Sequence, residues 1–364
     1  MHFAFTEQQE EFRLAVRQVL AKECTPDHLR AAHEAPEART PRWATLAGLG
    51  VTGLSVPESY GGLGLGPVDL VSLIEEAGAV GLPEPLVDTT ALAAPFLAGL
   101  PGGRDGGGRE AVGRERVGAW LEGIAAGTVT AAVGPVPHAT HPQPIAGADG
   151  ADLLVLYSAA DPATGTEAQV HVVDADAVTV RTVPSLDPTR RLGIPHWAPT
   201  PDSLVLSGDD AARAIGALED RAAVAVGAEL LGLARTMIGI AAEYARDRRQ
   251  FGAPIGSFQA VKHLMAGAAV ALEFARPVVY AAAWALDVGT DDASRSASVA
   301  KAYASDAAVE AARVSLQVHG AIGYTWECDL HLFLKRAWAL SESWGSATEH
   351  RRKVLDSLVE TRHR

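Results

Sequence analysis

Three arginines lie within four positions of one another in the stretch YARDRRQFGAPIGSFQAVKH, residues 244–263. A planar guanidinium offers parallel N–H donors that match the oxygens of a diphosphate or a carboxylate. At the carboxyl end of a helix, however, arginines also cap free carbonyls and complement the helix dipole. The cluster therefore predicts an anion site or a structural helix end, and for Arg246 and Arg249 we expect only the second.

A second segment that could meet an anion is QVHGAIG, residues 317–323. Gly320 has no Cβ, so the backbone around it can approach a ligand closely. Together with the Gln-Phe-Gly at 250–252, this segment favours the anion-binding interpretation for Arg248.

Isolated histidines and tryptophans carry no clear chemistry in this chain. A lone histidine in a helical run is rarely catalytic, so we expect His263 and His319 to pack or to form hydrogen bonds. We expect Trp284, Trp326 and Trp338 to lie in the core rather than to stack on a ligand.

Composition limits the classes of partner. The chain has 364 residues and a formal net charge of −13, with 48% hydrophobic and 21% charged residues. Nonspecific binding to nucleic acid or to anionic lipid needs a basic surface, so we expect neither nucleic acid nor a membrane among the partners. No apolar run reaches the roughly 18 residues of a membrane span, and the amino terminus carries glutamates where a signal peptide is apolar. The sequence predicts a soluble, cytoplasmic chain with protein and small-molecule partners.

The cysteines suggest neither disulfides nor a metal site. Cys24 and Cys328 are isolated, which fits a reducing compartment. Cys328 and His331 have a Cys-x-x-His spacing, but no second ligand pair accompanies them, so we expect no bound metal.

The sequence predicts helices in both its amino-terminal and its carboxyl-terminal region, and the arginine cluster lies among the carboxyl-terminal ones. Thr6 and Gln9 have capping-box spacing and precede an amphipathic helix. The turn-rich residues 56–67 interrupt the helical pattern, and residues 101–116 predict a mobile glycine-rich loop. Further helical segments are predicted at 41–48, 68–79 and 88–99, and four long helices are predicted at 213–247, 256–288, 291–319 and 328–360.

Between these helical regions, residues 128–206 contain short β-branched or alternating runs divided by Pro, Gly and Asp. We therefore predict an α+β multi-domain chain with a helical domain (1–126), a small antiparallel β domain (127–208) and a four-helix bundle (209–364). Pro277 should kink the second bundle helix or mark a restart.

The domain order and three motifs resemble the acyl-CoA dehydrogenase family. VPESYGGLGLGPVDLVSLIEEAG (56–78) is similar to a signature of the amino-terminal domain, and residues 244–263 are similar to the segment that joins the first two bundle helices. QVHGAIGYTWECDLHLFLKRAW (317–338) resembles the Gln-x-x-Gly-Gly-x-Gly segment before the last helix. The resemblance implies a homo-oligomeric flavoenzyme in which each FAD lies across a subunit interface.

By position, the resemblance implies a set of residues for the adenosine diphosphate half of a neighbour's FAD. Arg248 would contact the pyrophosphate. The remaining residues assigned to the cofactor are Gln250 and Phe251 beside it, Phe258 and Gln259 toward the adenine, the backbone cradle Gln317, Val318, His319, Gly320 and Ala321, and Ser346.

The sequence departs from the family at the catalytic base. The family removes the α-proton of a thioester with a carboxylate while a hydride goes to the flavin. That carboxylate is usually a glutamate before a Gly-Thr, but Trp344 precedes Gly345 here. A second position used in the family aligns with Ala222. The neighbouring carboxylates Glu219 and Asp220 are about half a turn out of place, and Glu229 and Glu342 are also off position.

The β domain departs in the same direction. The family holds the flavin ring with a Thr-Glu-x-x-x-Gly-Ser segment and a Trp-Ile-Thr strand. This chain has VGPVPHATHPQP (133–144) in the first place and no Trp-Ile-Thr in the second. It therefore resembles the partner subunit, without a catalytic base, of actinobacterial heteromeric (α2β2) acyl-CoA dehydrogenases that act on steroid side chains.

That resemblance implies FAD shared with a catalytic homologue, an acyl-CoA substrate that undergoes α,β-desaturation, and an electron-transfer flavoprotein or similar acceptor. Two alternatives remain open. One is a self-sufficient homo-oligomer with Glu219 or Asp220 as base, or another activity on this fold, and the other is a purely structural subunit. Flavin content separates them, since only the self-sufficient enzyme should be yellow when made alone.

Overall fold

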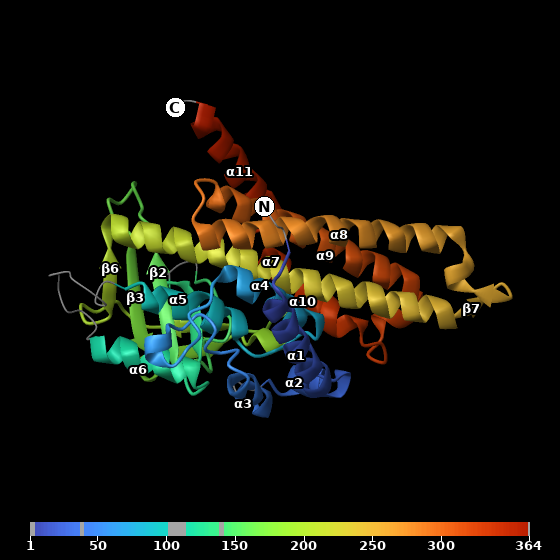
Figure 1. Cartoon of the computed structure of the whole chain (residues 1–364), viewed down its shortest axis with the longest axis horizontal. Coiled ribbons are helices and arrows are strands. Elements are labelled where there is room, and N and C mark those ends of the chain that lie inside the picture. The colour runs from blue at the N-terminus through green and yellow to red at the C-terminus, as the bar shows by residue number, and fades with distance from the viewer. Residues whose placement is uncertain (1–3, 37–39, 101–113, 138–141, 363–364) are drawn as a thin grey trace. The chain divides into compact units, whose positions relative to one another are not determined.

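The computed structural model describes residues 4–36, 40–100, 114–137 and 142–362. These residues form two compact units, each assembled from segments far apart in the sequence (Figure 1). Unit 1 contains residues 1–31, 67–82 and 223–364, and unit 2 contains residues 32–66 and 83–222. The division into three domains with boundaries at 126 and 208 stays a prediction.

Unit 1 is a helical bundle with one small hairpin. Its α1 begins after the Thr6 capping box, in which the Thr6 hydroxyl accepts from the Gln9 N–H and the Gln9 side chain accepts from the Thr6 N–H. The elements are α1 (Glu7–Glu23), the start of α2 (Pro26–Glu34), α4 (Pro67–Ala79), α7 (Gly208–Asp247) from Ala223, β7 (Arg249–Gln250), β8 (Ala253–Pro254), η5 (Ile255–Ser257), α8 (Gln259–Val288), α9 (Ala293–His319), η6 (Gly320–Tyr324), α10 (Leu330–Glu342) and α11 (Ala347–Arg362).

The first three predicted bundle helices correspond to α7, α8 and α9. Pro277 lies inside α8 without ending it, so a restart at this residue is not observed. The fourth predicted helix, 328–360, is wrong as a single element because Trp344 and Gly345 have φ angles of 58° and 99° and end α10. α11 then starts afresh at a capping pair, in which the Ser346 N–H donates to the Glu349 carboxylate (2.8 Å) and the Glu349 N–H donates to the Ser346 hydroxyl (3.3 Å).

A close helix crossing joins α4 to α7 in unit 1. A Cβ on Gly78 would lie 2.1 Å from the carbonyl oxygen of Glu229, and one on Gly232 would lie 2.0 Å from that of Glu75. Only glycine therefore permits this approach of the two backbones. Beside the crossing, Arg235 pairs with Glu75 (3.2 Å) and Glu76 (2.6 Å), both of which are buried.

Unit 2 combines helices with two small sheets. Its elements are α3 (Pro41–Gly48), η1 (Glu58–Tyr60), the π-helix η2 (Val87–Ala93), α5 (Ala94–Ala98), α6 (Arg114–Ala125), β1 (Ala131–Pro135), β2 (Leu153–Ser158), β3 (Gln169–Asp174), η3 (Ala175–Ala177), β4 (Thr179–Thr182), η4 (Pro188–Arg190), β5 (Gly193–His196), β6 (Leu204–Ser207) and the first turns of α7. Of the predicted loop 101–116, residues 101–113 lie outside the described part of the chain, and residues 114–116 begin α6.

The larger sheet has the order β1-β2-β3-β6, and β4 pairs with β5 in a separate ribbon. All of these pairs are antiparallel except β1 with β2, which is parallel, so the predicted antiparallel domain needs correction at this edge. Parallel neighbours need a connection that returns to the same end of the sheet. The chain between the two strands makes this return, and Ile145 within it bridges to Gly193 of β5.

Candidate functional site

The arginine segment forms a hairpin at the end of α7. The Arg248 N–H donates to the carbonyl of Tyr244 (2.9 Å), and the Ile255 N–H donates to the carbonyl of Arg248 (2.8 Å). Between these bonds, Phe251 and Gly252 have φ angles of 53° and 80°. Two successive positive φ angles fit the type I′ turn that joins two antiparallel strands. The hairpin therefore presents the segment at the end of the helix.

The side chains of the hairpin point to solvent. Phe251 is 95% exposed, and its ring meets the ring of Phe258 edge to face at a centroid distance of 6.1 Å. Arg248, Gln250 and Gln259 are also exposed, and within the described residues no hydrogen bond or ion pair engages the Arg248 guanidinium. The site thus offers an unneutralised cation and two amides beside an exposed aromatic pair.

The other two arginines differ from Arg248. The Nε–H of Arg246 donates to the carbonyl of Ala242 (3.2 Å), which confirms its expected role at the helix end. Arg249 lies in β7 and pairs through its backbone with Pro254 of β8.

The end of α9 lies against the same hairpin. The imidazole of His319 stacks on the ring of Tyr244 at 4.4 Å and 20°, and its Nδ1–H donates to the carbonyl of Ser315 (2.8 Å). Val318 packs in the same apolar cluster as Tyr244 and Ile255. The two sequence motifs are therefore brought together, and the prediction of a packing, hydrogen-bonding role for His319 is confirmed.

The predicted backbone cradle has buried and exposed members. Val318 and His319 are buried, whereas Gln317, Gly320 and Ala321 are exposed. Gly320 has a φ of 62°, which ends α9 and turns the chain into η6. The exposed members are the ones that a ligand can reach, and the cradle itself stays a prediction.

Three expectations about isolated aromatic residues are wrong. His263 is exposed on α8, and Trp284 and Trp326 are 37% and 70% exposed, while Trp338 is half-buried. The burial of a residue on a long amphipathic helix depends on which face of the helix meets the bundle, and the residue type alone does not reveal that face.

The loop at Trp344 is held by its backbone. The Lys301 ammonium, which is fully buried, donates to the carbonyls of Ser341 (2.9 Å) and Gly345 (3.0 Å). The Nε2–H of His350 donates to the carbonyl of Trp344 (2.9 Å). The residue at the usual base position is therefore fixed in place, and it is an indole rather than a carboxylate.

Glu349 and Glu229 already have structural roles. Hydrogen bonds from the backbone and hydroxyl of Ser346 lower the pKa of Glu349, which keeps the helix cap ionised. Glu229 is buried and pairs with Arg336 at 2.7 Å. Ser346, which the resemblance assigns to the cofactor, thus takes part in the cap of α11.

Glu219 and Asp220 lie on the part of α7 that belongs to unit 2. A helix turns about 100° per residue, so Glu219, three residues before the buried Ala222, is almost one full turn away and shares its face. The expectation that Glu219 lies half a turn out of place is therefore wrong. Asp220 is about half a turn out, as expected. Burial raises the pKa of Tyr157, and the charges of Glu219 and Asp88 raise it further, which places the Glu219 carboxylate beside a phenol that stays neutral.

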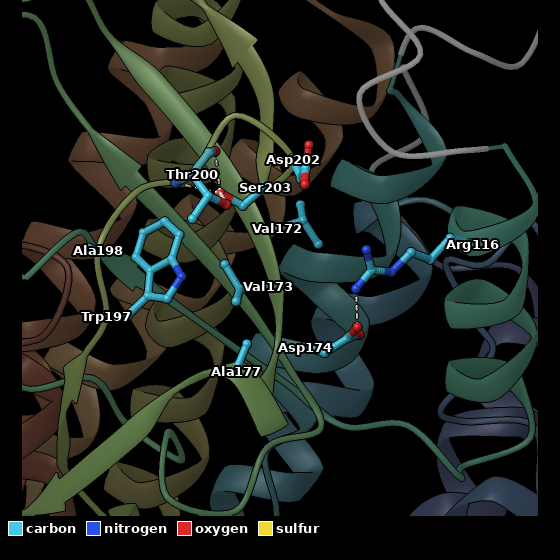
Figure 2. Close-up of a pocket in the computed structure, with 10 residues that line it drawn as sticks. All are labelled: Arg116, Val172, Val173, Asp174, Ala177, Trp197, Ala198, Thr200, Asp202 and Ser203. Atoms are coloured by element: carbon cyan, nitrogen blue, oxygen red, sulfur yellow. Dashed lines mark hydrogen bonds and ion pairs between the residues drawn. The ribbon is translucent and has the colours of Figure 1, made fainter.

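A pocket of about 430 Å³ lies on unit 2 between α6 and β3 (Figure 2). Within it, Arg116 bonds to Asp174, and the Ser203 hydroxyl donates to the carbonyl of Thr200 (2.8 Å). Trp197 lines another wall. The Arg116 guanidinium and the Asp174 carboxylate of this pocket neutralise each other.

The amino-acid sequence matches family models and known proteins over most of its length. Residues 6–98 match the family model of the acyl-CoA dehydrogenase N-terminal domain, and residues 213–358 match that of the C-terminal domain. The acyl-CoA dehydrogenase IpdE2 of Mycolicibacterium smegmatis is 32% identical over 351 residues, which cover 96% of this chain and 98% of that protein. The chain belongs to the acyl-CoA dehydrogenase family. FAD is accordingly its cofactor.

Solved structures of acyl-CoA dehydrogenases share the whole fold. A steroid enzyme described as Tcur3481-Tcur3483 is 25% identical with a TM-score of 0.82, and the ChsE4-ChsE5 complex of Mycobacterium tuberculosis is 26% identical with a TM-score of 0.81. Their matched chains cover 98% and 99% of this chain, and each is itself covered to 99%. The butyryl-CoA dehydrogenase of Megasphaera elsdenii, at 20% identity and a TM-score of 0.83, shows the fold alone. These likenesses confirm the predicted fold class.

Residues 99–212 lie between the two matches, and they contain every strand of unit 2. The helical regions that carry the arginine hairpin and the Gly320 segment lie within the C-terminal match.

Proposed function

We propose that this acyl-CoA dehydrogenase chain is a partner subunit that completes the FAD site of a catalytic homologue. The assembly would carry out α,β-desaturation of a CoA thioester and pass electrons to an electron-transfer flavoprotein or a similar acceptor. The observation that carries the proposal is the contrast within unit 1: the hairpin and the Gly320 segment are assembled, while Trp344 occupies a rigidly held loop at the base position.

The residues of this chain fit the diphosphate half of FAD. Arg248 would donate in parallel to the pyrophosphate oxygens, because its guanidinium is exposed and unpaired within the described residues. Gln250 and Gln259 add amide donors, and Phe251 adds an apolar surface for the rest of the cofactor. When bound, FAD supplies the acceptor for the substrate hydride, whereas these residues only bind and orient it.

This chain lacks the two segments with which the family holds the flavin ring. VGPVPHATHPQP (133–144), whose first three residues belong to β1, stands in place of the family's Thr-Glu segment, and no Trp-Ile-Thr occurs in the sequence. A complete site would therefore need the flavin ring to lie in another chain. That inference supports one FAD for each pair of subunits.

The relatives support a heteromer and a bulky acyl group. The ChsE4-ChsE5 relative is a complex of two proteins, and the Tcur3481-Tcur3483 relative, also named for two proteins, is a steroid acyl-CoA dehydrogenase. We propose the same kind of assembly, α2β2, for this chain, with a steroid side-chain thioester as the substrate.

Flavin content tests the proposal. The chain made alone should contain no FAD, and the chain co-purified with a catalytic homologue should contain about one FAD per pair. Arg248→Ala should weaken FAD binding in the complex by about 10-fold or more, since hydrogen bonds to charged groups contribute about 1.5–3 kcal/mol. Arg246→Ala is the matched control because Arg246 bonds to its own helix. Equal FAD affinity of the two variants would instead favour a purely structural subunit.

A second candidate is a self-sufficient enzyme with Glu219 as base, because this carboxylate shares a helix face with Ala222, the alternative base position. In that case the chain alone would be yellow and active, and Glu219→Gln would abolish the activity while Asp220→Asn would not.

A further inference from the structure

The pocket of about 430 Å³ in unit 2 lies between α6 and the end of β3 (Figure 2). Cavities of about 300–1,000 Å³ hold small molecules in proteins. Just beyond the ladder of β3 with β6, the Val172 N–H donates to the Ser203 carbonyl (2.9 Å). The two peptide groups of one strand residue face the same side, so the Val172 carbonyl is also turned toward Ser203. The end of β3 thus offers the pocket a backbone acceptor.

One wall of the pocket is a closed ion pair. Arg116 bonds to Asp174, and its guanidinium carbon lies 4.9 Å from the ring centroid of Trp120. The indole N–H of Trp120 donates to the same carboxylate (3.0 Å). The three side chains therefore hold one another in place, and the two charges of this wall cancel.

A second wall is a turn that is tied to itself and to β3. The Ser203 hydroxyl donates to the carbonyl of Thr200 (2.8 Å) and accepts from the Thr200 hydroxyl (3.1 Å). The ring nitrogen Nδ1 of the buried His171 lies 3.0 Å from the same Ser203 oxygen. Asp202 lies within this turn, is exposed, and has no hydrogen bond or ion pair with the described residues. The turn therefore presents one carboxylate from a rigid support.

The other lining residues are apolar. They are Val172, Val173, Ala177, Trp197 and Ala198. Trp197 is half-buried, and its ring meets the ring of His171 at an interplanar angle of 70°, with the centroids 5.1 Å apart. An indole held in this way offers a flat apolar surface, and its π system attracts cations.

The charges of the pocket select the kind of ligand. One arginine and two aspartates line it, which gives a net charge of −1, and the pairing of Arg116 with Asp174 leaves this charge on Asp202. An anion would be repelled there. Ca²⁺ or Mg²⁺ takes about six or more oxygen ligands, whereas Asp202 offers a single carboxylate. An organic cation fits both the charge and the apolar surface.

We propose that this pocket binds a small organic cation, in which an ammonium group is joined to an aromatic body. The ammonium has three N–H donors, which match the oxygens of the Asp202 carboxylate, the Thr200 hydroxyl and the Val172 carbonyl. The aromatic body packs against Trp197, and the adjacent positive charge adds a cation–π attraction.

The site is independent of the proposed FAD-dependent function. All of its lining residues lie between the two matched family regions, within 99–212, and none of the residues assigned to FAD is among them. Binding should be weak, with a dissociation constant of about 1 mM, because an exposed ion pair contributes little and a cation–π contact adds a modest amount.

Calorimetric titration of the purified full chain with 2-phenylethylamine tests the proposal. Phenylacetate has the same ring and the opposite charge, and ethylamine has the charge without the ring. Both should bind at least about 10-fold more weakly than 2-phenylethylamine. Phenylacetate that binds as well as the amine would overturn the proposal. Ethylamine that binds equally well would also overturn it, because it would show only the general attraction of an acidic protein for cations. No heat of binding up to about 10 mM 2-phenylethylamine would do the same.

Substitutions within the pocket locate the binding. Asp202→Asn keeps the shape of the side chain and should weaken the binding of 2-phenylethylamine about 3- to 5-fold. Asp209→Asn is the matched control because Asp209 is exposed on α7 and does not line the pocket. Trp197→Leu keeps an apolar side chain and should weaken binding at least about 3-fold, with circular dichroism to confirm folding. Equal affinities of Asp202→Asn and the wild type, or equal losses in Asp202→Asn and Asp209→Asn, would overturn the proposal.

Discussion

The crossing of α4 and α7 gives the sharpest test of the packing in unit 1. In the variant Gly232→Ala, the new Cβ would lie 2.0 Å from the carbonyl oxygen of Glu75 and 2.4 Å from the amide nitrogen of Ala79. Carbon and oxygen normally approach no closer than about 3.3 Å. Both neighbours are backbone atoms of a helix and cannot rotate away, so α4 and α7 would have to separate by roughly 1 Å.

The size of the effect follows from two opposing contributions. Alanine gains about 1 kcal/mol over glycine in a helix interior. Overpacking costs about 1–3 kcal/mol, and a clash with two backbone atoms belongs at the upper end. The separation would also stretch the bonds from Arg235 to Glu75 and Glu76. We expect Gly232→Ala to lower the free energy of unfolding by about 2 kcal/mol or more.

Gly239 is the matched control because it lies on the same helix and a Cβ there meets nothing within 4 Å. Gly239→Ala should leave the stability unchanged or raise it by up to about 1 kcal/mol. Urea denaturation followed by far-ultraviolet circular dichroism measures both variants. Equal stability of Gly232→Ala and Gly239→Ala would refute the close approach of α4 and α7.

Lys301→Met should cost about 3 kcal/mol in urea denaturation, because two buried carbonyls lose a charged donor, whereas exposed Lys262→Met should change stability by less than about 0.5 kcal/mol. Burial lowers the pKa of His350, and nearby lysines lower it further. Protonation of His350 therefore favours the unfolded chain, so the stability from this group is complete above about pH 6.5 and falls as the pH drops. A His350→Gln variant whose melting temperature falls as much as that of the wild type between about pH 7 and lower pH would contradict this. Arg336→Met should cost about 3–5 kcal/mol because it leaves Glu229 buried and unpaired, and a double variant with Glu229→Gln should recover part of the loss in a double-mutant cycle.

The elements that the sequence predicted well are those with local causes. The Thr6 capping box placed the start of α1 correctly, because both of its hydrogen bonds join residues three apart. The alternating runs between 128 and 206 became β1, β2, β3, β4 and β6. β5, with the sequence GIPH, was missed because it has no alternation and contains a proline.

The break between α10 and α11 had a readable signal that was overlooked. Ser346 and Glu349 have capping-box spacing, which marks a helix start inside the predicted helix 328–360. The positive φ of Trp344 could not have been anticipated, since a bulky residue rarely adopts it. Buried Lys301, 40 residues before Ser341, helps to stabilise this loop through a long-range contact.

The sequence predicted the two motifs of the candidate site, but it did not predict that they lie next to each other in the structure. The residue types around Arg248 and Gly320 indicated an anion, and the resemblance indicated which one. Their meeting depends on the stack of Tyr244 on His319 and on an apolar cluster of α7, α8 and α9. Those contacts join residues that are distant in the sequence, and the pattern of the sequence does not encode them locally.

The most direct test of the central claim is the FAD dissociation constant of the complex with a catalytic homologue, measured by flavin fluorescence for wild type, Arg248→Ala and Arg246→Ala. A chain that completes its partner's FAD site should give about one FAD per pair and at least 10-fold weaker binding for Arg248→Ala alone. Stoichiometric FAD in this chain when purified by itself, or equal affinities in all three complexes, would contradict the claim.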